Sequence, residues 1–193
     1  MSWTALVPIK PAAERKTRLA ALLEPSERKR LTDAMLVHVV ETLHRVSALD
    51  RILILSSTRI GDLSADWIED RGQGLNCELL HAAAAINTPL IVIHADMFDL
   101  EVADIVALMS AGEEGVAVAP DRHRTGTNAL ASAKPGDLAF RFGPDSFRAH
   151  CSLAGEGLRV VDRPGLANDV DLPEDLPADW FTEAARRKLR RAR

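Results

Sequence analysis

The sequence contains few cysteines and no cysteine motif. Cys77 and Cys151 are the only two among 193 residues, and neither belongs to a Cys-x-x-Cys or Cys/His pattern. Neither a disulfide framework nor a structural zinc site is therefore indicated. We expect both cysteines to be small buried residues.

Long apolar runs are also missing. No stretch approaches the roughly 20 apolar residues of a membrane-spanning helix. Residues 1–8 lack the basic start and the apolar core of a secretory leader. We therefore expect a cytoplasmic protein without a membrane partner.

An overall excess of basic residues is missing as well. The 28 acidic and 24 basic side chains give a formal net charge of -4, which excludes an overall basic nucleic-acid-binding protein. Residues 1–178 are expected to form one domain, because 47% hydrophobic residues suffice for a sizeable core. Residues 179–193 are strongly basic, and we expect a helix or tail that lies in solvent and binds no nucleic acid.

The order of the apolar segments predicts an α/β protein with a mostly parallel central sheet. Unbroken aliphatic runs are typical of parallel strands buried on both faces. Strand, helix and strand in succession favour crossover connections and parallel pairing. Ser26 is expected to be the N-cap of the first long helix. The predicted strands are residues 3–9, 51–57, 90–95, 115–119 and 158–161, and further helices are predicted over 79–86 and 100–109.

Asp96 follows the most apolar of these strands. It stands just past Ile91, Val92 and Ile93, and open α/β sheets bind ligands in the crevice outside the carboxyl ends of their strands. A carboxylate at this place is a site candidate. The alternative is that Asp96 only caps the helix predicted over residues 100–109.

Cationic side chains follow the first predicted strand. Lys10, Lys16 and Arg18 lie within nine residues, and cations that converge there could hold a triphosphate. The Gly-x-x-x-x-Gly-Lys-[Ser/Thr] pattern is absent, so the loop is not a P-loop and depends on side-chain charge. A solvated basic loop is the alternative.

A glycine-asparagine segment precedes the helix predicted over residues 79–86. Gly74 frees the backbone to approach a ligand, and Asn76 carries both a donor and an acceptor, as recognition of a base edge requires. An ordinary turn is the alternative.

A second group of polar residues follows the strand predicted over residues 115–119. Residues 122–128 form a hydroxyl-bearing loop that includes Thr127. Gly143 then precedes Ser146, and a helix N-terminus that follows a glycine and carries a hydroxyl is an anion site. Phenylalanines gather here and are expected to form local core rather than a stacking platform: Phe140, Phe142 and Phe147.

A second carboxylate group lies near the end of the chain. In an extended segment Asp169 and Asp171 project from the same face. With Asp96 they would give three hard oxygen donors, which suit Mg²⁺ bound by carboxylates and substrate phosphates. Glu174 and Asp175 are instead expected at the start of a short helix, where the helix dipole favours acidic side chains.

Together these features favour nucleotidyl transfer, in which a substrate phosphate attacks a nucleoside triphosphate and pyrophosphate leaves. A phosphate nucleophile is largely ionised near pH 7, since its second pKa is about 6, so no protein general base is required. Catalysis then depends on positioning and on neutralisation of charge. The histidines of the chain need no catalytic role.

Seven short motifs in sequence order resemble the 2-phospholactate guanylyltransferase family of deazaflavin-coenzyme biosynthesis. The match runs from Trp3 to about Leu176. The motifs are Leu6-Val7-Pro8-Ile9-Lys10, Lys16-Thr17-Arg18-Leu19, Gly74-Leu75-Asn76, Ala95-Asp96, Gly126-Thr127-Asn128, residues 142–147 with His150, and residues 169–176.

The resemblance implies a nucleotide-diphospho-sugar transferase-like three-layer fold. It also implies GTP-dependent guanylylation, with Mg²⁺, of 2-phospho-L-lactate, phosphoenolpyruvate or 3-phospho-D-glycerate. A downstream enzyme that adds the deazaflavin is an implied partner, and a homodimer is compatible with the sequence. By motif position the metal ligands would be Asp96, Asp169 and Asp171; the acid site Thr127, Gly143 and Ser146; the triphosphate contacts Lys10, Lys16 and Arg18; and the guanine neighbours Gly74 and Asn76.

The chain departs from the family pattern at two places. Met97 and Phe98 replace a proline-containing turn after Asp96, and Thr125 replaces the first glycine of a pair before Thr127. These changes leave the identity of the acid open. The alternatives are a molybdopterin or sugar-1-phosphate nucleotidyltransferase, which usually opens with a glycine-rich loop, and a protein that binds nucleotide without turning it over.

Overall fold

The chain folds around one seven-stranded sheet. The computed structural model describes residues 2–61 and 63–176. The strands are β1 (Trp3–Pro8), β2 (Leu49–Ser56), β3 (Asp66–Glu69), β4 (Leu90–Ile93), β5 (Val116–Pro120), β6 (Thr127–Ser132) and β7 (Leu158–Val160). The helices are α1 (Pro25–His44), α2 (Leu75–Ala84), α3 (Val102–Glu113), α4 (Ser146–Ala154) and α5 (Pro164–Ala167), with short 3-10 turns η1 (Ala12–Glu14), η2 (Thr17–Leu19), η3 (Pro135–Asp137), η4 (Gly155–Gly157) and η5 (Pro173–Asp175).

The strand order is β3-β2-β1-β4-β6-β5-β7, and β6 alone runs antiparallel to its neighbours β4 and β5. The pairs of β1 with β2 and with β4 are parallel, as the strand–helix–strand order predicted. The predicted α/β class with a mostly parallel sheet is therefore confirmed. Within the described residues no helix is long and apolar enough to cross a membrane.

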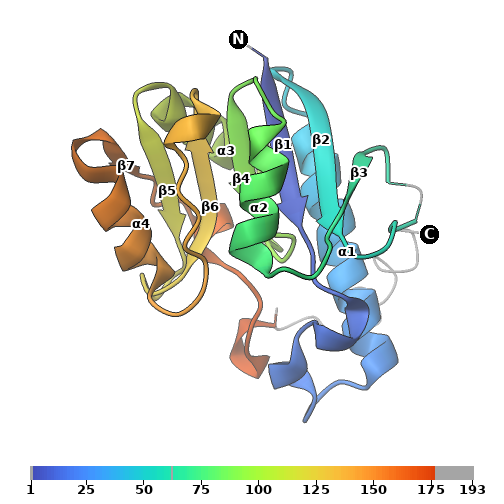
Figure 1. Cartoon of the computed structure of the whole chain (residues 1–193). Coiled ribbons are helices and arrows are strands. Elements are labelled where there is room, and N and C mark those ends of the chain that lie inside the picture. Colours follow the sequence, from blue (N-terminus) through green and yellow to red (C-terminus); the bar gives the residue numbers. More distant parts are fainter. Residues whose placement is uncertain (1, 62, 177–193) are drawn as a thin grey trace.

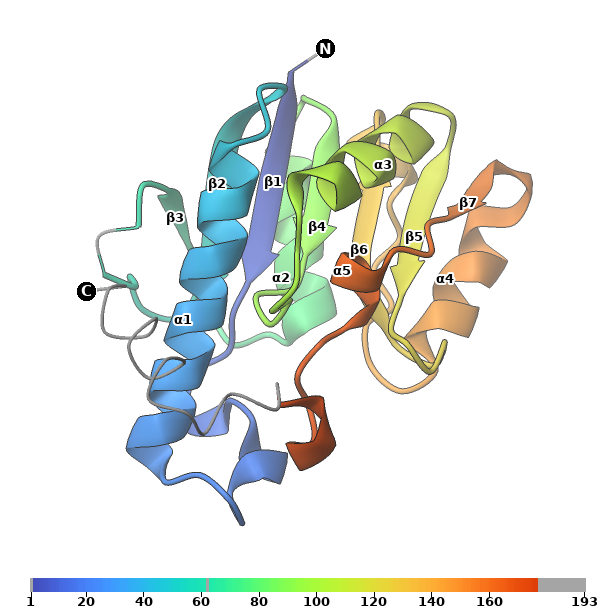
Figure 2. The same ribbon diagram turned by 180° about the vertical axis from the view of Figure 1, so that it is seen from behind.

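Helices cover both faces of the sheet (Figures 1 and 2). Side chains alternate along β1, so Ala5 and Val7 join the cluster under α1 and α3, whereas Leu6 joins the cluster under α2. Phe140 belongs to the second cluster, and Phe142 and Phe147 pack against it. The expectation that these phenylalanines form local core is confirmed.

A third apolar cluster joins the loop after β1 to the segment that follows α5. It contains Leu19 and Leu23 from the loop after β1, Met35 from α1, and Val170 from the segment after α5. This packing holds the cationic loop against the segment that carries Asp169 and Asp171. In Figures 1 and 2 both segments lie below the sheet, beyond the carboxyl ends of β1 and β4.

Several local expectations are wrong. Helix α1 begins at Pro25 with Glu24 as its N-cap, so Ser26 lies inside the first turn; the Glu24 N–H donates to the Glu27 carboxylate at 3.0 Å. Cys77 and Cys151 are half-buried rather than buried.

Two strands were not expected from the sequence. The exposed, four-residue β3 has too few apolar residues to give a strand pattern. The second, β6, includes Thr127, which was assigned to a loop. Ala131 of β6 lies against Gly112 of α3, where an added Cβ would lie 3.1 Å away, so close packing favours small residues that carry little strand signal.

Candidate active site

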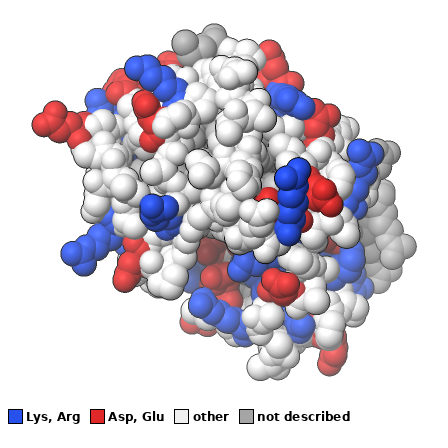
Figure 3. All heavy atoms as spheres, in the orientation of Figure 1, with Lys and Arg blue, Asp and Glu red and all other residues white. Residues whose placement is uncertain are grey.

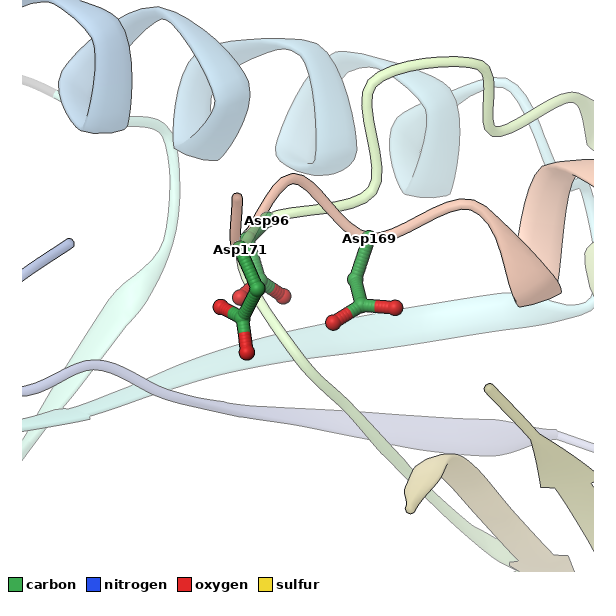
Figure 4. A group of neighbouring side chains, drawn as sticks. All are labelled: Asp96, Asp169 and Asp171. Carbon is green, nitrogen blue, oxygen red and sulfur yellow. The ribbon is translucent and has the colours of Figure 1, made fainter. Parts of the chain in front are cut away.

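Three carboxylates meet beyond the end of β4. Asp96 follows β4, whereas Asp169 and Asp171 lie between α5 and η5 (Figure 4). Each offers an oxygen within 4.8 Å of the others. Val170 is buried in the third apolar cluster, so its two neighbours project to the opposite side, as the extended spacing predicted.

Backbone and amide contacts fix the positions of these carboxylates. Met97 pairs with Asp169 in an antiparallel bridge, and the Asn128 side chain donates to Asp169 Oδ1 at 3.2 Å. The alternative role of Asp96 as a helix cap is wrong, because α3 has Glu101 as its N-cap. The carboxylate of Asp96 is therefore available to the cluster.

Lys16 neutralises part of this negative charge. Its Nζ lies 2.5 Å from Asp96 Oδ2 and 2.7 Å from Asp171 Oδ1, and its side chain is 8% exposed. Burial opposes the charged form, but the two carboxylates outweigh it and raise the pKa of Lys16. Burial likewise opposes ionisation of Asp96, yet the charge of Lys16 lowers the pKa of that carboxyl.

The donor set fits a divalent cation. Asp96 Oδ1 is buried, and no described residue gives it a hydrogen bond. Burial, and after it the charge of Asp96, raises the pKa of Asp169. Three carboxylates face the buried Lys16 ammonium and the exposed Arg18, so net negative charge remains on hard oxygen donors, which suit a divalent cation such as Mg²⁺.

The other cations of the loop lie at different distances from the carboxylates. Arg18 is 69% exposed in its side chain and reaches Asp171 Oδ2 at 3.4 Å. Lys10 is exposed, and its carbonyl accepts from Arg15 Nε at 2.6 Å. Arg15 also pairs with Asp33 at 3.0 Å, which ties the loop to α1. The alternative of a freely solvated basic loop is therefore wrong for Lys16.

The surface at this end of the molecule is charged. In Figure 3 side chains of both signs gather toward the lower end, where the loop after β1 lies, and the area above them is largely uncharged. A phosphate ligand with a bound cation would meet side chains of opposite charge there, basic ones for the phosphate and acidic ones for the cation.

A second, uncharged group of side chains lies where β6 meets α4. Thr127 opens β6 and Ser146 opens α4, and both are 2% exposed. Gly143 has a φ of 135°, in the region that favours glycine. The Phe147 N–H donates to the Thr125 carbonyl at 3.2 Å, which holds the helix start against the loop before β6.

Asn76 contacts the protein backbone. Its amide nitrogen donates to the Phe142 carbonyl at 3.0 Å, and its amide oxygen accepts from the Phe142 N–H at 2.8 Å. Gly74, with a φ of 92°, is the N-cap of α2. The structure therefore places Asn76 where it orients the segment before Gly143, and its contact with guanine stays a prediction.

Three supporting residues were not recognised from the sequence. Asn128 holds Asp169 as described above. Asp175 lies at the predicted short helix, and its Oδ2 accepts from the N–H groups of Asp171 and Leu172 at 2.8 and 2.7 Å. His150 contacts Thr127. Asn128 and His150 lie within or beside motifs that were recognised, but their roles depend on contacts between distant segments.

The departures from the family pattern lie directly beside the carboxylate cluster, at Met97 and Phe98, and in the loop before β6, at Thr125. Met97 is fully buried. The Thr125 hydroxyl donates to Asp121 Oδ2 at 3.1 Å, and its N–H donates to Asp121 Oδ1 at 2.9 Å. Thr125 is therefore used within its own loop.

Solved structures support the fold. A protein from Desulfovibrio desulfuricans assigned to the nucleotide-diphospho-sugar transferases superposes with a TM-score of 0.71 at 15% identity, covering 100% of this chain and 99% of that one. A nucleotidyl transferase from Methanothermobacter gives a TM-score of 0.65 at 16% identity, covering 98% and 99%. The chain thus has the expected nucleotide-diphospho-sugar transferase fold.

Sequence relatives define the family. A phosphoenolpyruvate guanylyltransferase of Rubrobacter xylanophilus is 39% identical, over 91% of this chain and 92% of that protein. One from Sphaerobacter thermophilus is 35% identical, over 91% of each. Residues 3–180 also match the family described as guanylyl transferase, CofC-like. The chain is therefore a nucleotidyltransferase that belongs to the CofC-like guanylyl transferase family.

Proposed function

We propose that this protein transfers GMP from GTP to a small phosphorylated carboxylic acid and releases pyrophosphate, with phosphoenolpyruvate as the preferred acid. The observation that carries the proposal is the position of the carboxylate cluster and Lys16 beyond the parallel strands, near a separate group of buried hydroxyls. The acid follows the names of the relatives in Rubrobacter and Sphaerobacter. The proposed product would receive a deazaflavin group from a downstream enzyme.

The charged groups would bind the nucleotide. Asp96, Asp169 and Asp171 would hold Mg²⁺, which when bound would neutralise phosphate charge and orient the reacting phosphates. Lys16 and Arg18, together with Lys10 beyond β1, would hold the triphosphate and stabilise the departing pyrophosphate. The guanine would lie near Gly74 and Asn76.

The uncharged groups would bind the acid. The hydroxyls of Thr127 and Ser146 and the backbone at Gly143 would contact its phosphate or carboxylate, at the N-terminus of α4. Because the acid's phosphate is already ionised near neutral pH, the protein needs to position it and not to deprotonate it. No described side chain is assigned as a general base.

The test is pyrophosphate release from GTP and Mg²⁺, with 2-phospho-L-lactate, phosphoenolpyruvate and 3-phospho-D-glycerate offered in parallel. A deazaflavin-transferring enzyme with its acceptor is included to consume an unstable product. Release with phosphoenolpyruvate above the other two supports the proposal. Preference for another acid corrects the substrate, and silence with all three despite GTP binding rejects acid guanylylation.

The basic C-terminal residues, which lie outside the described residues, offer a further check. Residues 179–193 are not assigned to the site, so a chain ending at residue 178 should keep both GTP binding and turnover. Loss of GTP binding on that truncation would contradict the placement of the nucleotide site in the body of the chain.

A further inference from the structure

One ring nitrogen of His150 has a partner that can only donate. Nε2 lies 2.9 Å from the backbone nitrogen of Arg141. A backbone N–H has no acceptor capacity, so Nε2 must accept and cannot carry a proton in this arrangement. This contact fixes the role of one side of the ring.

The proton of the neutral ring is therefore on Nδ1. Burial is the main cause that lowers the pKa of His150 to about 4; His94 and Arg141 act in the same direction and a hydrogen bond to the Ser146 backbone opposes them, so the ring is neutral near pH 7. A neutral imidazole with a bare Nε2 carries its hydrogen on Nδ1. Nδ1 lies 2.9 Å from Thr127 Oγ1, and the threonine oxygen is therefore the acceptor of this hydrogen bond.

This assignment determines where the hydroxyl hydrogen of Thr127 points. Because Oγ1 accepts from His150, its own hydrogen must point elsewhere, and within residues 2–61 and 63–176 the contact with His150 is the one side-chain hydrogen bond of Thr127. Thr127 is 2% exposed. Buried donors are normally paired, so an unpaired one beside a helix N-terminus indicates a bound acceptor.

The surroundings hold the imidazole in place. The Phe142 ring contacts it edge-on, with centroids 5.0 Å apart at 66°. Asn76 fixes the backbone of Phe142 through two hydrogen bonds. Ser146 lies one turn before His150 on α4 and is 2% exposed. The His150 ring and the hydroxyl-bearing residues Thr127 and Ser146 thus lie together at the start of α4.

We propose that His150 is a positioning residue for the acid: it orients Thr127 so that the threonine hydroxyl donates to an oxyanion of the phosphorylated substrate. The proposal rests on the proposed function, because that function places the acid at Thr127. A histidine with a purely structural role would support the packing of α4 without affecting one substrate selectively.

Two substitutions of His150 test the hydrogen bonds of its two ring nitrogens separately. H150N can place an amide donor near the former Nδ1, whereas H150Q can place an acceptor near the former Nε2. For H150Q we expect the KM for the acid to rise about tenfold, with the KM for GTP unchanged, since Thr127 no longer has the partner that directs its hydroxyl to the charged acid. H150N is expected to recover most of the acid affinity. Equal effects of both variants on both substrates would overturn the proposal.

A double-mutant cycle tests whether His150 acts through the hydroxyl. T127V removes the hydroxyl with little change of volume, and T127S keeps it. In the T127V background, H150Q is expected to cause no further rise in the acid KM. An additional tenfold rise in that background would show that His150 acts by another route, and would refute the proposal.

The tautomer can be measured without turnover. Nitrogen-15 NMR of histidine-labelled protein, with His150 assigned by comparison with H150N, should show a protonated Nδ1 and a bare Nε2 at neutral pH. The opposite tautomer would overturn the inference whatever the substrate is. If the wild type turns over none of the acids, the proposed function fails; if it turns one over and H150Q leaves the acid KM unchanged, only the role of His150 fails.

Discussion

The carboxylate cluster and the hydroxyl group around Thr127 are built in contrasting ways. Asp96, Asp169 and Asp171 are charged, and Lys16 holds two of them by ion pairs of 2.5 and 2.7 Å. Thr127 is neutral and is held by one hydrogen bond from His150. In the proposed function the first region would attract a cation and phosphates, whereas the second would select among small acids by the direction of its donors.

Charge and hydrogen-bond direction therefore contribute different properties to one site. Interactions between charges act over several ångströms and tolerate small displacements. A hydroxyl donates along a single direction, so a neighbouring group must decide where its hydrogen points. Changes in the cluster should therefore affect turnover broadly, and changes around Thr127 should affect the acid selectively.

The largest effect is expected for Asp96→Asn. The substitution removes a charge from the cluster and weakens the position of Lys16, so turnover should fall by more than about 100-fold, as for loss of a group that stabilises transferred charge. Pyrophosphate release measures this, and circular dichroism checks the fold. Asp99→Asn, in the same loop but exposed, is the matched control. Near-normal turnover of Asp96→Asn would refute the metal role.

A smaller, selective effect is expected for Lys16→Met. Loss of the ammonium should raise the KM for GTP about tenfold, because one charge-assisted contact is lost, and should raise the KM for the acid less. Initial rates with each substrate varied in turn measure this. Lys29→Met removes an exposed lysine paired with Asp33 and serves as the control. An unchanged GTP dependence would contradict a triphosphate contact of Lys16 and leave it the role of pairing with Asp96 and Asp171.

Asp175→Ala tests how the cluster is held. The carboxylate accepts from the N–H groups of Asp171 and Leu172 and pairs with Arg122. Its loss should raise the Mg²⁺ concentration for half-maximal rate about tenfold, as for other residues that support metal ligands. Glu174→Ala, an exposed neighbour, should have no such effect. Equal Mg²⁺ dependence of both variants would contradict this role.

The smallest effect is expected for the pH dependence of the free energy of unfolding, through His150. The pKa of His150 falls from 6.5 to about 4 on folding, so between these values the unfolded chain binds more protons than the folded one. The contribution of a neutral His150 is therefore fully present above pH 6.5 and is lost as pH falls toward 4. Urea unfolding across this range should show a steeper loss of stability for the wild type than for H150N. Parallel curves would contradict the pKa shift.

The carboxylate cluster was easier to predict from the sequence than the hydroxyl group around Thr127. Asp96 follows an unmistakable buried strand, and the spacing of Asp169 and Asp171 puts both on one side of an extended segment. Ser146 is predicted as an anion contact from its place at a helix start after Gly143, but the role of Thr127 in binding the acid comes only from resemblance to a family, and the sequence predicts a loop where Thr127 in fact opens β6. Alanines that permit close packing against α3 gave β6 too little strand character.

The α/β class, the parallel pairing of β1 with β2 and β4, and the three acidic residues of the cluster could be predicted from the sequence, because they follow from local apolar patterns and from side-chain charge. The contacts of Lys16 with Asp96 and Asp171, of Asn76 with the Phe142 backbone, and of His150 with Thr127 became visible only in the folded chain. These contacts join segments up to 155 residues apart. Their geometry depends on how separate elements pack on the sheet, which no local pattern specifies.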